Sequence, residues 1–229
     1  MCLIISVTFA VPSFFRNRLH KHIPIIPFLF AIPIIVIVGI ENLSTCIILL
    51  AISFIMIFVA TPLLVPFVVI GLIGVAGAGG LLLTQGYRME RITVWLDPAA
   101  SEKGHQTIQG LYAIGSGGLF GKGLGQSMQK LGFLPEANND MIFSVICEEL
   151  GLYGALCVLA LFFAPIWRFM VIAVNAPDLY GSMIVVGVIA HIGIQVFINI
   201  AVATNTIPNT GIPLPFISYG GSSLVFMLL

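Results

Sequence analysis

Residues 141–166, MIFSVICEELGLYGALCVLALFFAPI, indicate the fold of this chain because they form an almost unbroken apolar run. A helix crosses about 30 Å of membrane hydrocarbon with roughly 17–25 mostly apolar residues. Glu148 and Glu149 are the only charged residues in the run. Since an unpaired charge inside a membrane is costly, both glutamates are expected to face other helices or a wet cavity.

The composition of the whole chain supports the same prediction. Of its 229 residues, 59% are hydrophobic, and the mean hydropathy is +1.13. The chain contains nine Lys or Arg residues and nine Asp or Glu residues. Soluble domains are about 25% charged and about 45–50% apolar. So few charges exclude a soluble enzyme and a disordered tail, and the lack of a basic excess excludes nucleic acid as a partner. An integral membrane protein remains.

Apolar runs recur along the chain and predict an all-α fold, a polytopic transmembrane helix bundle. The first and last runs are too short to cross a membrane alone, and a half-span would leave backbone groups unsatisfied in lipid. We therefore expect one integral membrane domain that is part of a larger protein, cut at both ends. The expected spans are approximately 1–14, 23–40, 43–60, 62–86, 141–166, 181–203 and 216–229.

The basic residues predict the orientation of these spans. Residues 16–22 are basic and lack acids, so the positive-inside rule places them in the cytoplasm. Counting spans from there puts residues 87–140 outside, as a large extracytoplasmic loop, although this segment contains five Lys or Arg residues. Most of the charges of the chain lie in or beside this loop, since twelve of the eighteen fall between Arg88 and Glu149.

Part of the loop has the pattern of a surface helix. Residues 104–114, GHQTIQGLYAI, are expected to form a short amphipathic helix at the membrane surface. Its apolar face would consist of Ile108, Leu111 and Tyr112.

A glycine-rich segment, GSGGLFGKGLGQ at residues 115–126, comes next. It is not a nucleotide-binding P-loop, because Ser116 stands where such a loop needs Gly and Gly123 where it needs Ser or Thr. Backbone amides of the turn, together with Lys122, could hold a pyrophosphate anion. The alternative is a tight turn with a solvated lysine.

Asp140 is the residue that we single out for chemistry. It immediately precedes the apolar run, where Asp is favoured as a helix N-cap. Partial desolvation at the membrane surface could also raise its pKa toward that of a useful base. Glu148, two turns further along, belongs either to the same cavity or to an ion pair with a base such as Lys122 or Lys130.

A polar stripe runs along the expected span 181–203. His191, Gln195 and Asn199 recur every four residues and therefore share one helix face. Such residues usually bond to neighbouring helices inside a membrane. A path for a polar substrate is the alternative.

Four segments of the chain have the form of known signatures. They are ENLSTCIILL (41–50), QTIQGLYAIGSGGLFGKGLG (106–125), LGFLPEANNDMIFSVICEELGLYGA (131–155) and NTGIPLPFISYGGSSL (209–224). All four resemble signatures of one known family, SEDS (shape, elongation, division and sporulation). Residues 175–182, NAPDLYGS, together with the Tyr-Gly-Gly-Ser-Ser block, resemble its FtsW and SpoVE branch more closely than RodA.

The resemblance implies a multi-pass enzyme of the bacterial plasma membrane that polymerises peptidoglycan from lipid II on the outer side. Such an enzyme is an inverting glycosyltransferase with a polyprenyl-pyrophosphate-linked donor, active in cell division or sporulation. The implied partners are a class B penicillin-binding protein and other division or sporulation membrane proteins. The family's essential acid falls on Asp140. Because the family's earlier spans are absent, we expect this fragment alone to be inactive.

If the reaction is glycosyl transfer, particular side chains are expected to have roles in it. Asp140 is the expected general base. Lys122 and Lys130 are expected to face the pyrophosphate, with a divalent cation such as Mg²⁺ or Mn²⁺ held in part by Glu136. Further substrate contacts are expected at Gln109, Ser218 and Ser222, and structural or cavity roles at Glu148, Glu149, His191 and Gln195.

Two other functions stay open at this point. A lipid II flippase would use Glu148, His191 and Gln195 as a path for the headgroup through the membrane. A non-catalytic scaffold for a penicillin-binding protein would use the loop only to dock its partner.

Overall fold

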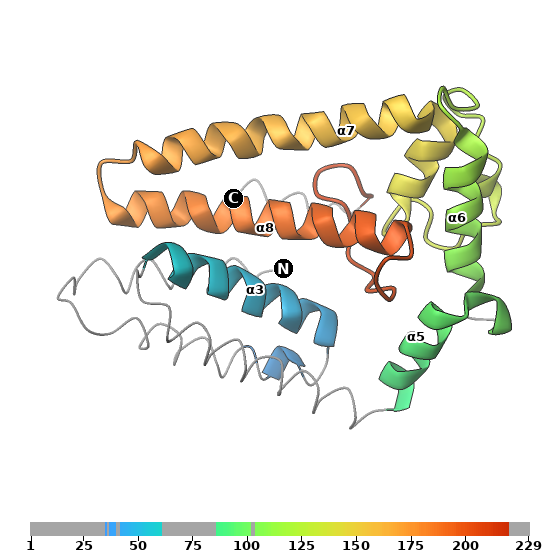
Figure 1. Cartoon of the computed structure of the whole chain (residues 1–229), viewed down its shortest axis with the longest axis horizontal. Helices are drawn as coiled ribbons and strands as arrows, with labels where there is room; N and C mark the ends of the chain where they lie inside the picture. The colour runs from blue at the N-terminus through green and yellow to red at the C-terminus, as the bar shows by residue number, and fades with distance from the viewer. Residues whose placement is uncertain (1–34, 36, 40–41, 61–85, 102–103, 220–229) are drawn as a thin grey trace. The chain divides into compact units, whose positions relative to one another are not determined.

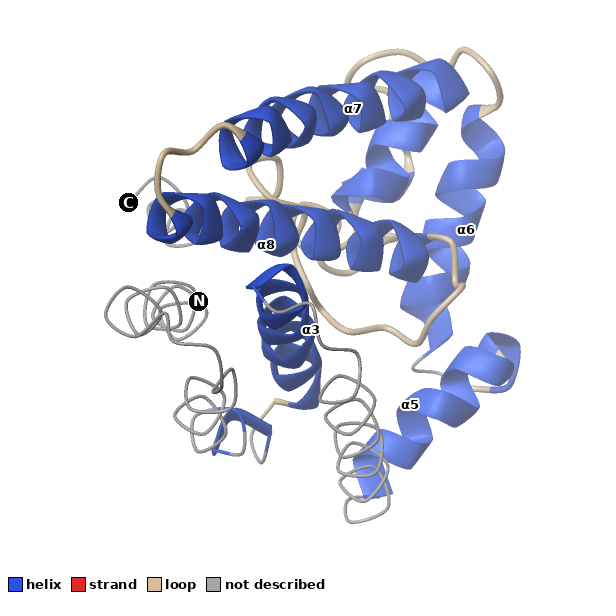
Figure 2. Cartoon of the chain, turned by 60° about the vertical axis from the view of Figure 1, so that its left-hand side comes forward, coloured by secondary structure: helices blue, strands red, loops and turns tan. Residues whose placement is uncertain are grey.

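The computed structural model of the protein describes residues 35, 37–39, 42–60, 86–101 and 104–219. Every regular element in these residues is a helix (Figure 2). The predicted all-α fold is therefore confirmed. These residues belong to two compact units, one from residues 1–84 and 165–194 and the other from residues 85–164 and 195–229. Four of the expected spans lie wholly or mostly outside the described residues, namely 1–14, 23–40, 62–86 and 216–229.

Helix α3 (Leu43–Ala60) belongs to the first unit and has the same bounds as the expected span 43–60. Asn42 caps its beginning, because the side-chain Oδ1 accepts hydrogen bonds from the backbone N–H groups two and three residues further on, at 3.1 and 3.3 Å. Leu49 and Ile52 on one side are fully buried, whereas Phe58 is largely exposed.

Helices α7 (Ile142–Val174) and α8 (Leu179–Ala203) are both long and apolar enough to cross a membrane. In the first unit they form an antiparallel hairpin (Figure 1). Asp178 caps α8 by accepting a hydrogen bond from the Gly181 backbone N–H (3.2 Å). The Ser182 hydroxyl donates to the Ala173 carbonyl (2.8 Å) and so ties the two helix ends together.

Helix α7 is interrupted at Gly151, whose φ of 65° and ψ of −163° are not helical. The apolar run 141–166 therefore contains a short helix, residues 142–150, followed by a longer one that sets off in another direction (Figure 1). Glycine reaches a positive φ without the steric cost that a Cβ would bring. The two glutamates of the run lie in the short helix, just before the break.

The glycine-rich segment 115–126 holds the two parts of α7 at their junction. The backbone N–H of Lys122 donates to the Glu148 carbonyl (3.0 Å) before the break. The backbone N–H of Leu152 donates to the Gly118 carbonyl (3.0 Å) after it. These bonds satisfy backbone groups that an interrupted helix leaves without intrahelical partners.

Helix α6 (His105–Gly117) packs against the short helix of α7 through small residues. A Cβ on Gly117 would lie only 1.9 Å from the Cys147 carbonyl oxygen, so the two backbones are very close. Leu111 and Tyr112 of the expected apolar face point away from this contact and are 36% and 62% exposed. The buried residues of α6 are Thr107, Gly110, Ala113 and Gly117.

Replacing Gly117 by Ala is expected to lower the free energy of unfolding by about 1–3 kcal/mol, because the new methyl group would overlap the Cys147 carbonyl. Gly115→Ala is the matched control, since a Cβ on Gly115 would have no atom within 4 Å. The control should be neutral or stabilise by up to about 1 kcal/mol through helix propensity. Thermal unfolding midpoints in one detergent measure both. Equal midpoints would contradict the close packing of α6.

Candidate functional site

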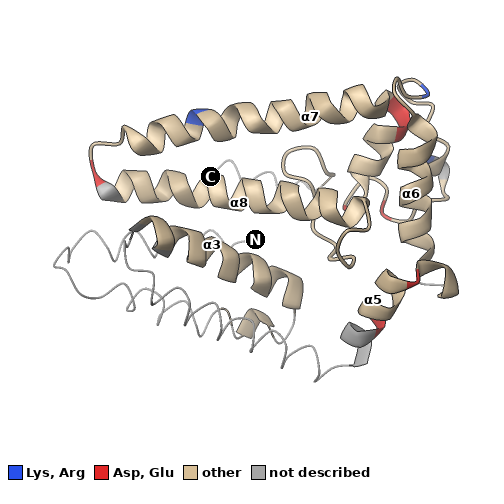
Figure 3. Cartoon of the chain, in the orientation of Figure 1, with Lys and Arg blue, Asp and Glu red and all other residues tan. Residues whose placement is uncertain are grey.

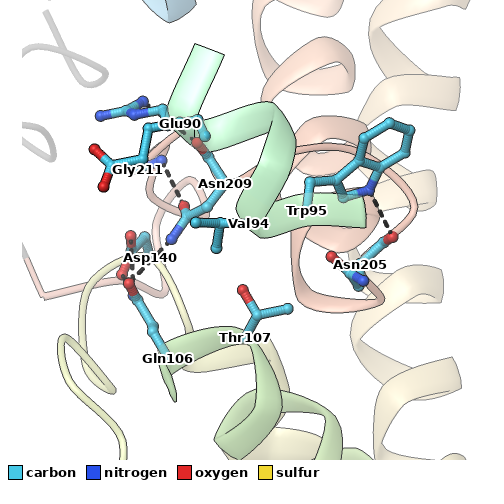
Figure 4. A pocket seen from close by; sticks show the side chains of 10 residues that line it. Glu90, Val94, Trp95, Gln106, Thr107, Asp140, Asn205, Asn209 and Gly211 are labelled. Atoms are coloured by element: carbon cyan, nitrogen blue, oxygen red, sulfur yellow. Dashed lines mark hydrogen bonds between the residues drawn. The ribbon is translucent and has the colours of Figure 1, made fainter. Parts of the chain in front are cut away.

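The second unit contains a pocket of about 420 Å³ with Asp140 in its wall (Figure 4). Helix α5 (Gly86–Leu96), the beginning of α6, the turn before α7 and the segment after α8 all contribute to this pocket. Figure 3 shows acidic residues around α5, α6 and the beginning of α7, and few charges along the rest of α7 and α8. The residues that line it include Glu90, Arg91, Trp95, Gln106, Asp140 and Asn209.

Helix α5 is attached to the segment after α8 by two hydrogen bonds. The indole N–H of Trp95 donates to the Asn205 carbonyl (3.0 Å), and the Arg91 guanidinium donates to the Asn209 carbonyl (3.3 Å). Arg91 and Trp95 are four residues apart, so they lie on the same face of the helix. A 3₁₀ turn at Pro98–Ala100, capped by the Asp97 side chain, then ends this part of the chain.

The carboxylate of Asp140 is bonded to a side chain that the sequence did not single out, Gln106. Its Nε2 lies 3.4 and 3.5 Å from the two carboxylate oxygens. The side-chain oxygen of Gln106, Oε1, in turn accepts a hydrogen bond from Asn209 Nδ2 (3.0 Å). Figure 4 shows the three side chains converging. Because Asn209 occupies the acceptor of Gln106, the amide group of Gln106 is oriented with its donor toward Asp140.

The backbone of Asp140 is held from another direction by Asn199. Its Nδ2 donates to the carbonyls of Asp140 and Ile212, both at 2.8 Å, and the residue is only 1% exposed. The last member of the predicted polar stripe therefore bonds to neighbouring backbone, one of the two roles considered for it. Its companions His191 and Gln195 are also buried.

Burial raises the pKa of the Asp140 carboxyl above its ordinary value, and the nearby charge of Glu136 raises this pKa further. A hydrogen bond from its own backbone and the one from Gln106 oppose the increase. The carboxylate accepts from Gln106 rather than from the first backbone N–H groups of α7, so it faces the pocket and is not a side-chain cap. A raised pKa makes the ionised carboxylate a better proton acceptor.

Lys122 and Glu148 form an ion pair away from this pocket. Glu148 is fully buried, and its Oε1 lies 2.6 Å from the ammonium of Lys122, a residue whose side chain is one-third exposed. The other carboxylate oxygen accepts from the Ser127 hydroxyl (2.5 Å) and from the Gln129 backbone N–H (3.4 Å). Of the two alternatives for Glu148, the structure shows the pair with Lys122, which ties the glycine-rich segment to α7.

Lys122 also lines a second pocket of about 640 Å³ in the same unit. Gln109 lies there as well and bonds to His105 on the preceding turn of α6 (3.3 Å). Tyr112 and Phe133 give this pocket an apolar wall. Neither Lys122 nor Gln109 therefore lines the pocket that contains Asp140.

The remaining candidates take different places. Lys130 and Glu136 are exposed, and Glu136 bonds to Asn139 beside Asp140. The Ser218 hydroxyl donates to the Asn139 carbonyl and accepts from the Leu214 N–H (2.7 Å), which connects the end of the described chain to the turn before α7. Glu149 is partly buried, and Ser222 lies outside the described residues.

The residues around Asp140 partly fit a divalent cation. Within the described part of the chain, no three His, Cys, Asp or Glu side chains gather into a metal-binding group. Asp140 and Glu136 are nevertheless close enough for one charge to raise the pKa of the other group. Mg²⁺ commonly binds through one or two carboxylates together with substrate phosphates. A cation that arrives with a phosphorylated substrate is therefore compatible with this site.

Sequence reasoning missed Gln106, Asn209, Arg91 and Trp95. The sequence held a signal for the first two of these residues. Gln106 is one turn before the predicted contact Gln109 and on the same short helix. Asn209 opens a motif that the resemblance had already marked.

The fold and the pocket define a helical membrane protein with a partly buried carboxylate just before a long apolar helix. The family model of FtsW, RodA and SpoVE, described as cell cycle proteins, matches residues 1–229. The chain belongs to this family.

Its relatives include proteins with assigned names. The chain is 52% identical over 192 residues to stage V sporulation protein E of Bacillus subtilis, covering 82% of this chain and 52% of the relative. It is 45% identical over 180 residues to a probable peptidoglycan glycosyltransferase FtsW of Coxiella burnetii, covering 76% and 48%. The chain thus spans about half the length of the curated relatives it matches.

Solved structures show the same fold. A chain of a peptidoglycan synthase complex is similar over 98% of this chain and 65% of its own length, with a TM-score of 0.76 and 24% identity. The rod shape determining protein RodA of Thermus thermophilus is similar over 99% of this chain and 61% of its own, with a TM-score of 0.65 and 25% identity. The family and the apolar helices place the protein in a membrane.

Proposed function

We propose that this chain is part of a peptidoglycan glycosyltransferase that polymerises lipid II into glycan strands during cell division or sporulation. The observation that carries the proposal is the Asp140 carboxylate, which lies in the wall of a polar pocket with its pKa raised by burial. The names of the FtsW and SpoVE relatives support the same activity.

Asp140 acts as the general base. It removes the proton from the 4-hydroxyl of the acceptor sugar while that oxygen attacks the anomeric carbon of the donor. The bond from this carbon to the polyprenyl pyrophosphate breaks on the opposite face, so the configuration inverts. A positioned base contributes about 10²- to 10⁴-fold to the rate. Gln106 and Asn199 keep the carboxylate and its backbone in place for this step.

The supporting roles follow from where the side chains lie. Glu136, beside Asp140, together with the substrate's phosphates would hold a divalent cation, which would offset negative charge on the leaving group. Lys122, Lys130 and Gln109 contact more distant parts of the glycan or lipid around the second pocket. Ser218 belongs to the segment that bonds to the turn before Asp140, and it contacts the substrate there together with Ser222, four residues further along the chain.

The orientation and the partners belong to the same proposal. The pocket opens on the outer side of the bacterial plasma membrane, where the loop 87–140 lies between membrane spans. The partners are lipid II, a class B penicillin-binding protein and other division or sporulation membrane proteins. The similarity to a chain of a peptidoglycan synthase complex supports assembly with such a partner.

Polymerisation by the purified full-length protein tests the function. With lipid II as substrate and moenomycin present to silence classical glycosyltransferases, we expect moenomycin-resistant glycan strands on a gel. Lipid II movement across liposomes without polymer would instead identify a flippase. A protein that binds its penicillin-binding partner but does neither would be a scaffold.

Loss of the Gln106 amide should change the pH dependence of this activity. Its hydrogen bond lowers the pKa of Asp140, so Gln106→Leu is expected to raise that pKa. A base is active only when ionised, so the acidic limb of the rate profile should move to higher pH. Gln109→Leu is the control, because Gln109 bonds to His105 rather than to Asp140. A limb that stays in place in Gln106→Leu would contradict the contact.

A further inference from the structure

The proposed reaction leaves negative charge on a diphosphate. The pocket around Asp140 contains a positively charged side chain that could stabilise this charge. Glu90 and Asp140 are the acids among its described lining residues, and Arg91 is the base. Charge that develops in a transition state is best stabilised by donors that are already oriented toward it. Arg91 is therefore the side chain in this pocket whose charge complements the leaving group.

Of the two lysines expected to face the pyrophosphate, Lys130 is not among the described residues that line this pocket, and Lys122 is paired elsewhere. Lys122 lines the second pocket, and its ammonium is 2.6 Å from the buried carboxylate of Glu148. Its charge is thereby largely neutralised by a partner that cannot reach water. A diphosphate bound at Lys122 would compete with Glu148 and would leave that carboxylate buried without its counterion.

Arg91 is held in position without losing its capacity to bind an anion. One guanidinium nitrogen donates to the Asn209 carbonyl (3.3 Å), which is neutral, and the residue remains exposed. A guanidinium has several further N–H donors in a planar fork that matches phosphate oxygens. Asn209 also donates to Gln106, which bonds to Asp140, so the cation and the base belong to one hydrogen-bonded frame.

We propose that Arg91 forms a diphosphate subsite in the Asp140 pocket and binds the polyprenyl-diphosphate end of the donor. This subsite rests on the proposed function. When the bond between the anomeric carbon and the diphosphate oxygen breaks, its electron pair stays on that oxygen, and Arg91 stabilises the resulting charge. The proton of the acceptor hydroxyl goes to Asp140, on the opposite side of the reacting carbon.

Binding of farnesyl diphosphate, a soluble short-chain probe, to the full-length protein tests the subsite independently of catalysis. Titration should show Arg91→Gln binding the probe about 10- to 100-fold more weakly than wild type, the loss expected for a charge-assisted contact. Arg91→Lys should fall between them, because a point charge remains but the planar fork is lost. Asp140→Asn should bind at least as tightly as wild type, since it removes a negative charge from the pocket.

Two comparisons distinguish the diphosphate from other anions and from general charge effects. Arg168→Gln removes an exposed arginine from α7 and should leave probe binding and polymerisation unchanged. In nanodiscs with and without phosphatidylglycerol, wild-type affinity for the probe should be the same if the subsite takes a diphosphate rather than a lipid headgroup. A probe affinity of Arg91→Gln equal to wild type, or a wild-type affinity that phosphatidylglycerol abolishes, would overturn the subsite.

The outcome also separates the subsite from the general base. If Arg91→Gln loses probe binding while Asp140→Asn polymerises normally, the subsite stands and the role of Asp140 fails. If Asp140→Asn is inactive while Arg91→Gln binds the probe normally, the general base stands and the subsite is wrong.

Discussion

Replacing Asp140 by Asn in the full-length protein is expected to reduce glycan polymerisation by about 10²- to 10⁴-fold, the contribution of a positioned general base. Asparagine keeps the size of the side chain and can still accept a hydrogen bond from Gln106, but it cannot take a proton. The measurement is the initial rate of polymer formation from lipid II in the presence of moenomycin. Polymerisation at the wild-type rate would remove Asp140 from the mechanism.

The same variant should not lose stability, which separates a chemical defect from misfolding. Burial raises the pKa of Asp140 in the folded protein above its ordinary value. Folding therefore favours the protonated carboxyl over the ionised one. The contribution of the Asp140 carboxyl to the free energy of unfolding decreases as the pH rises through its pKa in the folded protein. At neutral pH the uncharged asparagine relieves this cost, so the unfolding midpoint should equal or exceed that of wild type. A clear decrease would indicate a structural role.

Replacing Lys122 by Met is expected to destabilise the fold by about 3–5 kcal/mol, because it leaves the carboxylate of Glu148 buried without its counterion. The thermal unfolding midpoint in detergent measures the effect. Lys130→Met is the matched control, since Lys130 is an exposed lysine of the same loop and its loss should change stability by no more than about 0.5 kcal/mol.

A second substitution distinguishes the buried charge from lost packing. Gln at position 148 is uncharged but keeps an oxygen that can accept from Ser127 and from the Gln129 backbone. The double variant Lys122→Met with Glu148→Gln should therefore recover most of the stability lost in Lys122→Met. No recovery would mean that the lysine stabilises the loop by packing rather than by charge.

Helices that depend on local sequence could be predicted. Leu43–Ala60 matched its expected bounds because an apolar run of that length and an Asn at its start suffice to define a helix. The break at Gly151 could not be predicted in the same way. Glycine permits a positive φ but does not require it, and here the backbone bonds from the distant glycine-rich segment make the break favourable.

The candidate site could likewise be predicted only in part from the sequence. Asp140 was identifiable because a carboxylate at the edge of an apolar span is unusual and because its motif resembles that of a known family. Its partners were not identifiable, since Gln106 and Asn209 are 103 residues apart and Gln106 and Asp140 are 34 apart. Their hydrogen bonds exist only once α6, the turn before α7 and the segment after α8 have met.

By itself, the sequence determined that the chain is helical, apolar and membrane-embedded, and that its charges gather around one acid. These properties depend on composition and on periodicity over a few turns. Only the tertiary structure decided that Lys122 neutralises Glu148, that Arg91 shares the pocket of Asp140, and that small residues of α6 form its buried face. The physical reason is that pairing, burial and pKa depend on which distant segments exclude water from each other.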